Sequence, residues 1–174
     1  VEYKSEADDV REFRSDSTQM IIVARAPKEE DNDYFKRALG HPLLYSVIAF
    51  DADALIVNAA AQDSIFTIKT LNKILTDSVS GKYQVLLDGD NATSTVRFLM
   101  DSITNGKPFG INVKGTKGNE EVLQQVADNQ NAIGFVGSSW VINADIENKY
   151  KGKVKLAFVE CKRCNDGTFA KPSQ

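Results

Sequence analysis

The stretch that most constrains the fold runs from Gln84 to Ile103 and reads QVLLDGDNATSTVRFLMDSI. Gln84–Leu87 is a brief apolar run that predicts a strand, and Asp88–Asn91 are residue types that end strands and form turns. The apolar residues after the turn recur at helical spacing: Val96, Leu99, Met100 and Ile103. This pattern predicts a helix that begins near Thr93–Thr95.

The hydroxyl residues Thr93, Ser94 and Thr95 fall at the start of this predicted helix. The first turn of a helix offers amide groups without intrahelical acceptors and the positive end of the helix dipole, so an oxyanion can bind there. Ser and Thr are also the favoured capping residues of any helix. Taken alone, the stretch therefore leaves both an anion site and ordinary capping open.

Composition limits the classes of protein that this chain can belong to. Its 174 residues, 42% of them hydrophobic, suit one sizeable domain or two small domains with real cores. The net charge of −3 gives no electrostatic reason to expect nucleic acid, and no apolar run is long enough to span a membrane. The chain opens at Val1 without an initiator Met or a signal peptide, so we expect a piece cut from a longer protein whose location its termini do not reveal.

The first part of the chain is predicted to contain two strands and two helices. The ranges, in order, are a strand end at 1–4, a short helix at 7–13, a strand at 19–24 and a surface helix at 28–39. Within residues 19–24, Met20–Val23 is a continuous apolar run, typical of a parallel strand that is covered on both faces. In the helix at 28–39 we expect Tyr34, Phe35 and Leu39 to pack inward.

Arg25 follows that predicted buried strand directly. Ligands of open α/β sheets bind just beyond the carboxyl ends of strands, and a guanidinium group can hold an oxyanion bidentately. Arg25 is therefore a candidate oxyanion ligand. A solvated surface arginine is the alternative.

The rest of the chain alternates apolar runs with helical patterns, which predicts a mostly parallel sheet flanked by helices. The further predicted strands are 45–50, 54–57, 110–113, 132–136 and an edge strand at 153–161, and the further predicted helices are 68–75, capped by Thr67, and 119–128.

Catalytic and metal-binding patterns are weak. His41 is the only histidine and precedes Pro42, which favours a loop, and no triad or zinc-ligand spacing accompanies it. Cys161 and Cys164 form a single CxxC with a turn after it, so a hairpin disulfide or two free thiols is favoured over a zinc site. We expect no enzyme activity, no cofactor and no metal.

Several stretches, in order along the chain, resemble the phosphate-binding component of bacterial ABC importers, a type II periplasmic-binding-protein fold. The matching stretches are MIIVARAP, FDADALIVNAAAQ, IKTLNKILTDSV, DGDNATSTVRF and NAIGFVGSSW, which together span most of the chain from Met20 to Trp140. The resemblance implies a two-lobed α/β fold, with residues 1–49 as a partial first lobe, 50–139 as a complete second lobe and 140–174 as the return to the first lobe.

The resemblance also implies a set of ligand residues. Thr93, Ser94 and Thr95 cover the family's Ser-Gly-Thr, Arg25 falls where its phosphate-binding Asp lies, and Ser5 matches an early hydroxyl contact. The family's central Gly is replaced by Ser94, and its preceding Arg falls within Asp88–Asp90.

We therefore expect a solute-binding component of an ABC importer that holds phosphate or a related oxyanion between two lobes, with Arg25 across a cleft from Thr93–Thr95. Its implied partners are the membrane subunits of the transporter, and its implied location is the periplasm or the cell envelope, as a lipoprotein. The alternative is a non-catalytic interaction or scaffold module of the same fold that has lost or changed its ligand.

Overall fold

The structure is a computed structural model that describes residues 2, 4, 6–76, 81–89, 93–161, 164 and 167–171. It divides into two compact units, Val1–Asp51 and Ala52–Gln174. The lobe boundaries expected after residues 49 and 139 stay a prediction.

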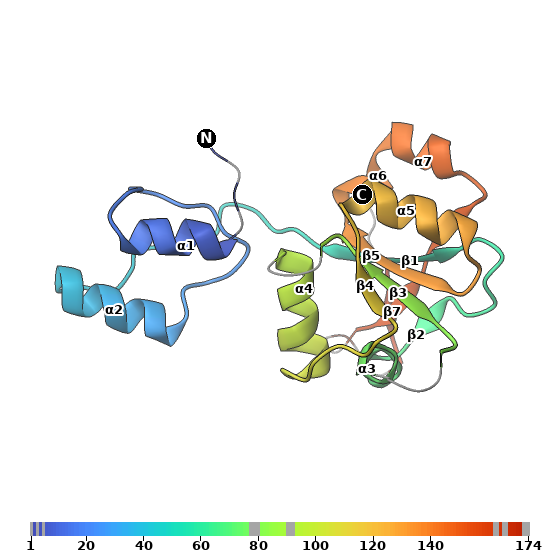
Figure 1. Cartoon of the computed structure of the whole chain (residues 1–174), viewed down its shortest axis with the longest axis horizontal. Helices are drawn as coiled ribbons and strands as arrows, with labels where there is room; N and C mark the ends of the chain where they lie inside the picture. Colours follow the sequence, from blue (N-terminus) through green and yellow to red (C-terminus); the bar gives the residue numbers. More distant parts are fainter. Residues whose placement is uncertain are drawn as a thin grey trace. The chain divides into compact units, whose positions relative to one another are not determined.

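The first unit contains two helices, α1 (Glu6–Arg14) and α2 (Glu29–Leu39) (Figure 1). Both carry acidic residues in the first turn and basic residues in the last, which complements the helix dipole. Gly40, with φ of 79°, ends α2 in the left-handed conformation that glycine adopts at little cost. The rings of Phe13 and Phe35 pack with centroids 5.1 Å apart, and Phe35 is buried as predicted.

The strands predicted in the first unit are wrong. Residues 19–24 and 45–50 belong to no strand, and Glu2 and Lys4 lie outside strands as well, while Val1 and Tyr3 fall outside the described residues. Leu39 is exposed rather than packed. A strand needs a neighbour for its backbone hydrogen bonds, and no described residue of this unit forms one.

The second unit is built on a five-stranded sheet in the order β4-β3-β5-β1-β6. Its strands are β1 (Asp53–Asn58), β3 (Gln84–Leu87), β4 (Val113–Gly115), β5 (Ala132–Gly137) and β6 (Val154–Leu156). Strand β3 runs parallel to β4 and β5, whereas β1 runs antiparallel to β5 and β6. Among these five strands, β4, β3, β5 and β6 therefore run in the same direction and β1 opposes them. The predicted mostly parallel sheet is confirmed except at β1, because an apolar run shows that both faces are covered but does not show the strand direction.

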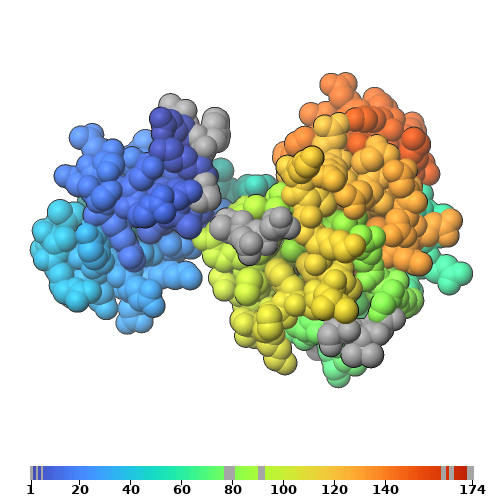
Figure 2. Space-filling view, in the orientation of Figure 1, coloured from blue at the N-terminus to red at the C-terminus, as the bar shows by residue number. Residues whose placement is uncertain are grey.

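Helices cover both faces of this sheet (Figure 1). They are α3 (Ile68–Thr76), α4 (Ser94–Leu99) continued by the π-helix η1 (Met100–Thr104), α5 (Asn119–Asp128), α6 (Ser139–Ile142) and α7 (Ala144–Tyr150). Alternate strand residues serve opposite faces: Leu55 and Val57 pack with α3 and α4, while Ala54 and Ile56 pack with α5. Edge strand β4, in yellow, reaches the visible surface of the unit (Figure 2).

The chain enters and leaves the centre of this sheet at one place. Asp53 at the start of β1 pairs with Gly137 at the end of β5, and the Ser138 amide donates to the Ala52 carbonyl at 2.7 Å. The segments 52–53 and 137–138 therefore lie side by side.

The predicted edge strand at 153–161 is divided at Ala157. Its first half is β6, which does lie at the edge of the large sheet. Its second half is β7 (Phe158–Glu160), the middle strand of a small sheet with β2 (Ile65–Phe66) and β8 (Phe169–Ala170). The buried Ala157 donates its amide to Leu55 and the next amide, of Phe158, donates to Ser64, so the chain changes sheets here.

A disulfide joins Cys161 and Cys164 after β7. The hairpin disulfide, one of the two predicted states, is therefore the one formed. In the part of the chain that the structure describes, no helix combines the length and apolar character needed to cross a membrane.

Candidate functional site

The predicted anion turn follows β3 and leads into α4. Thr93 is the N-cap of α4: its Oγ1 accepts a hydrogen bond from the Val96 amide at 3.2 Å. The same hydroxyl donates to Asp88 Oδ1 at 3.0 Å. The helix start predicted near Thr93–Thr95 is confirmed, whereas the turn residues 90–92 lie outside the described residues.

Gly89 fits closely against this cap. A Cβ at position 89 would come within 2.6 Å of Thr93 Cγ2. The Thr93 side chain is fixed by hydrogen bonds on both sides, to the Val96 amide and to Asp88, so it cannot readily move aside. A residue without a side chain is therefore needed at position 89.

Thr95 is buried and connects the helix to two strand ends. Its Oγ1 lies 2.8 Å from Asp53 Oδ1 and 3.3 Å from Asp88 Oδ2, and the residue is 2% exposed. Asp53 begins β1 and Asp88 follows β3, so the hydroxyls of Thr93 and Thr95 lie among carboxylates from two strands.

Ser94 differs from its two neighbours because its side chain is exposed. The amides of Ser94 and Thr95 precede the first helical hydrogen bond from the Arg97 amide to the Thr93 carbonyl. A hydroxyl and two first-turn amides are thus the groups here that can donate to an oxyanion. The nearby carboxylates of Asp53 and Asp88 repel a fully ionised anion but can accept a proton-bearing hydroxyl of the ligand.

A shallow pocket of about 490 Å³ lies beside this turn in the second unit. It is lined by Leu87, Gly89, Phe109, Gly110, Val113, Lys114 and Gly115. Thr93, Ser94 and Thr95 are not among these lining residues, so the pocket is not the predicted anion site.

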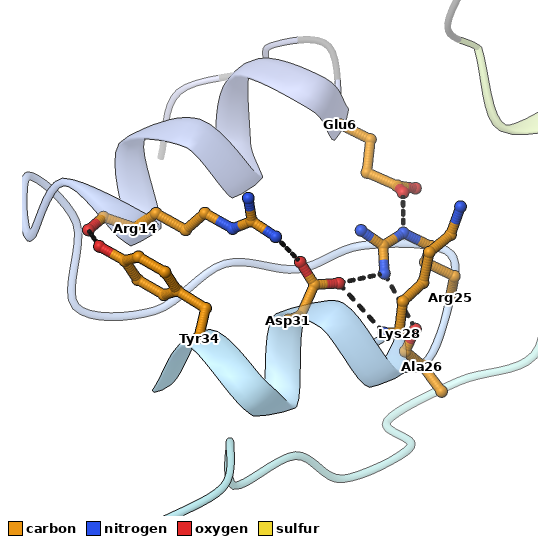
Figure 3. Close-up of polar contacts among 7 residues, drawn as sticks. All are labelled: Glu6, Arg14, Arg25, Ala26, Lys28, Asp31 and Tyr34. Atoms are coloured by element: carbon orange, nitrogen blue, oxygen red, sulfur yellow. Dashed lines mark hydrogen bonds and ion pairs between the residues drawn. The ribbon is translucent and has the colours of Figure 1, made fainter. Parts of the chain in front are cut away.

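Arg25 lies in a polar cluster of the first unit (Figure 3). Its Nε donates to Glu6 Oε1 at 2.7 Å and its Nη1 donates to Asp31 Oδ2 at 2.9 Å. Nη1 also donates to the Ala26 carbonyl at 3.1 Å. Because the strand expected before it is absent, Arg25 is positioned by these contacts and not by a strand end.

Asp31 is the centre of that cluster. Its side chain is 7% exposed, and its carboxylate accepts hydrogen bonds from Arg14 at 2.6 Å, from Arg25 and from the Lys28 amide at 3.0 Å. The bond from Lys28 caps the start of α2. Burial alone raises the pKa of Asp31, but the hydrogen bonds from Arg25, Lys28 and Arg14 outweigh it and lower the pKa below its ordinary value.

The structure gathers Thr93, Ser94 and Thr95 at one helix start in the second unit, whereas Arg25 belongs to the first unit. Ser5 lies outside the described residues. His41 is exposed, and among the residues described no three His, Cys, Asp or Glu side chains are grouped so as to hold a metal ion.

A scan against protein-family models matches residues 1–170 to the PBP superfamily domain, that is, the periplasmic-binding-protein superfamily. The chain belongs to the PBP superfamily. No curated protein sequence matches it.

Solved structures agree with this membership of the PBP superfamily. A possible phosphate binding protein from Planctomyces limnophilus is 18% identical and has a TM-score of 0.64, over 94% of this chain and 60% of that one. A proposed phosphate ABC transporter substrate-binding protein with bound phosphate from Clostridium perfringens is 16% identical and has a TM-score of 0.64. The match covers 89% of this chain and 61% of that one. PstS from Borrelia burgdorferi is 15% identical and has a TM-score of 0.59. The match covers 88% of this chain and 62% of that one.

At these identities the likeness shows the fold: the chain has the α/β fold of type II periplasmic binding proteins, with a sheet flanked by helices. The chain spans about three fifths of the length of these PBP structures.

Sequence reasoning missed the acidic partners of the predicted site residues. Asp88 was interpreted as part of a turn and Asp53 precedes the predicted strand at 54–57, yet they accept the hydrogen bonds of Thr93 and Thr95. Their place beside strand ends was the available signal, since that is where ligand residues of α/β sheets gather. Nothing local marked Glu6 as a partner of Arg25, because the two residues are 19 positions apart in sequence.

Proposed function

We propose that this chain is the solute-binding part of an ABC importer and that it captures phosphate or a related oxyanion. Two findings support the proposal: membership of the PBP superfamily over residues 1–170, and the likeness of the fold to proteins described as phosphate-binding. In this proposal the chain binds its solute without transforming it and needs no cofactor.

The observation that carries the proposal is the Thr-Ser-Thr run at the start of α4, directly beyond the end of β3. The amides of Ser94 and Thr95 point along the first turn, where the helix dipole favours negative charge, and the exposed Ser94 hydroxyl adds a donor. The family resemblance assigns ligand contacts to the same three positions.

The carboxylates near these hydroxyls make the proposed site prefer an oxyanion that carries a proton. An oxyanion that carries a proton can donate it to Asp88 or Asp53, whereas one without a proton meets only repulsion from them. Phosphate keeps a proton near neutral pH and sulfate does not. We therefore propose that phosphate is favoured over sulfate.

Arg25 remains a proposed second contact, as the family resemblance suggests. Its guanidinium is held by Glu6 and Asp31, so a bound anion has to share it with two carboxylates. Ser5 stays a proposed contact of the same kind.

The proposed partners are the membrane subunits of an ABC transporter. The proposed location is the periplasm or the cell envelope, where the chain would belong to a lipoprotein. Both follow from the type of protein proposed here.

Isothermal titration of the purified protein with phosphate, sulfate and chloride tests this function. We expect saturable heat with phosphate, weaker heat with sulfate and none with chloride. Absence of heat with every oxyanion, from protein whose helices and strands are intact by circular dichroism, would refute the proposal and favour the scaffold alternative.

A further inference from the structure

The disulfide between Cys161 and Cys164 has no part in the proposed binding of an oxyanion. These are the two cysteines of the chain, and the bond directly follows β7. Cys164 is exposed, whereas Cys161 is partly buried. Since these 174 residues contain no third thiol, reduction and reoxidation within one chain break and remake this same bond. The pair can therefore alternate between two defined states.

The second unit does not need this disulfide in order to fold. The bonded residues are 3 positions apart, and a disulfide that closes so short a loop removes little entropy from the unfolded chain. The core of the unit consists of two clusters of buried apolar side chains on the faces of the large sheet, and neither cluster contains a cysteine. We therefore expect the unit to remain folded when the two thiols are reduced.

Strand β8, in contrast, is weakly held. It lies at the edge of the small sheet and pairs with β7 over two residues on each strand. The Cys161 amide extends this contact by a hydrogen bond of 2.9 Å to the Thr168 carbonyl. Hairpins of this length are marginally stable at best in water. The disulfide adds a constraint, because it fixes the chain at the point where β7 ends and the connection to β8 begins.

Strand β7 is held on its other side by contacts that include neither cysteine. It pairs in parallel with β2, and the Phe158 amide donates to the Ser64 carbonyl at 2.8 Å. Glu160 Oε2 accepts a hydrogen bond of 2.9 Å from the Ile68 amide at the start of α3. Loss of the disulfide should therefore release β8 and leave β7 and α3 in place. Strand β7 then changes from a middle strand into an edge strand with unpaired backbone groups.

We propose that Cys161 and Cys164 form a reversible redox site that an external dithiol reduces, and that their disulfide controls the pairing of β8 with β7. One thiolate of the dithiol attacks the exposed Cys164 Sγ, which forms a mixed disulfide and releases Cys161 as a thiolate. The other thiolate then closes the disulfide of the reagent and releases Cys164. Two electrons pass to the cysteines, and the two protons of the dithiol end on their sulfur atoms. The reverse exchange, with an oxidised dithiol, restores the bond.

Dithiothreitol is the probe for the first test, without denaturant. Alkylation and mass spectrometry count the thiols released, and hydrogen–deuterium exchange compares the oxidised and reduced protein. We expect both thiols to be released and the amides of residues 167–171 to exchange at least about tenfold faster, while α3 and β5 exchange as before. Reoxidation should restore slow exchange.

Three outcomes of this comparison overturn the proposal. One is that no thiol is released from the folded protein. Another is that residues 167–171 exchange equally in the two states, which would mean that β8 does not depend on the disulfide. The third is faster exchange throughout the second unit, because the disulfide would then support the whole fold and would not act on β8 alone.

A matched pair of single-cysteine variants tests the point of attack. Cys161→Ser leaves the thiol of Cys164, and Cys164→Ser leaves the thiol of Cys161. Each reacts with an aromatic disulfide whose released thiolate is followed by absorbance. The Cys164 thiol should react at least about fivefold faster, because it is the more exposed. Equal rates, or faster reaction of Cys161, contradict the proposed attack at Cys164. In the double serine variant, residues 167–171 should exchange fast with and without dithiothreitol, and slow exchange there contradicts the control of β8.

Discussion

The hydroxyl of Thr95 donates a hydrogen bond of 2.8 Å to Asp53 Oδ1, which joins the start of α4 to the start of β1. The two residues are 42 positions apart in sequence. Asp53 also pairs with Gly137 across the sheet, so this one bond connects the candidate anion turn to the place where the chain enters and leaves the sheet. The start of α4 is therefore positioned by contacts within the second unit.

Thr95→Val tests that relationship. Valine keeps the shape of threonine but removes the donor from a buried position, so the free energy of unfolding should fall by about 1–3 kcal/mol. Chemical denaturation measures the change. Thr95→Ser, which keeps the hydroxyl, should recover most of the loss; a serine variant as unstable as the valine variant would show that the methyl group and not the hydrogen bond matters.

Ser94→Ala tests the proposed oxyanion contact. The side chain is exposed, so stability should be unchanged, while loss of one hydrogen bond to the anion should weaken phosphate binding by about twofold to tenfold. Titration calorimetry measures the affinity. Ser139→Ala is the matched control, because Ser139 is also an exposed serine at the first position of a short helix. If both variants bind phosphate as the unaltered protein does, the Ser94 hydroxyl is not a ligand contact.

Asp31→Asn tests the polar cluster of the first unit and its pH dependence. Removing the carboxylate should lower stability at pH 7 by about 2 kcal/mol, because Arg14 and Arg25 each lose an ion pair with it. The native pKa of Asp31 is lowered, so its stabilisation is present above the ordinary carboxyl pKa of 3.8 and is lost as pH falls through the lower native value.

The difference in stability between Asp31→Asn and the unaltered protein should therefore shrink as the pH is lowered below that range. Denaturation curves at several pH values measure it. Asp33→Asn, at an exposed position of the same helix, should show no such trend. A difference that stays constant with pH contradicts the role given to the Asp31 carboxylate.

Arg25→Ala separates a structural role from ligand binding. The side chain links Glu6 of α1 to Asp31 of α2, so its removal should destabilise the first unit by about 2 kcal/mol. If Arg25 also holds the anion, phosphate binding by the folded protein should weaken by about tenfold to a hundredfold. Hydrogen exchange of α2 measures the first effect and calorimetry the second, with Arg37→Ala at an exposed position of α2 as the control. If phosphate affinity is unchanged while the amides of α2 exchange faster, Arg25 has a structural role and does not bind the anion.

Replacing Cys161 and Cys164 by Ser should leave phosphate affinity unchanged. The disulfide closes a short loop beside β7 and β8, so its loss should cost about 2 kcal/mol or less by loop-closure entropy. Calorimetry and thermal denaturation measure the two effects. Lost phosphate binding in the double variant, or stoichiometric zinc bound by the reduced protein, would be evidence for a functional pair of thiols.

The sequence by itself determined the elements whose signals are local. Strands β1, β3 and β5 follow from short apolar runs between turn residues, and α5 follows from its apolar spacing. The start of α4 was predictable because an N-cap is a contact between residues two or three positions apart. The superfamily was also recognisable, from stretches in the right order.

Tertiary structure decided what depends on a distant neighbour. Residues 19–24 and 45–50 have the composition of strands but remain irregular, because a strand exists only where another backbone satisfies its hydrogen bonds. The direction of β1 and the division at Ala157 were set by pairing with β5, β6 and Ser64. Thr95 and Arg25 each contact a carboxylate from a segment remote in sequence, Asp53 and Glu6, so the electrostatic character of the candidate site could be seen only once the chain was folded.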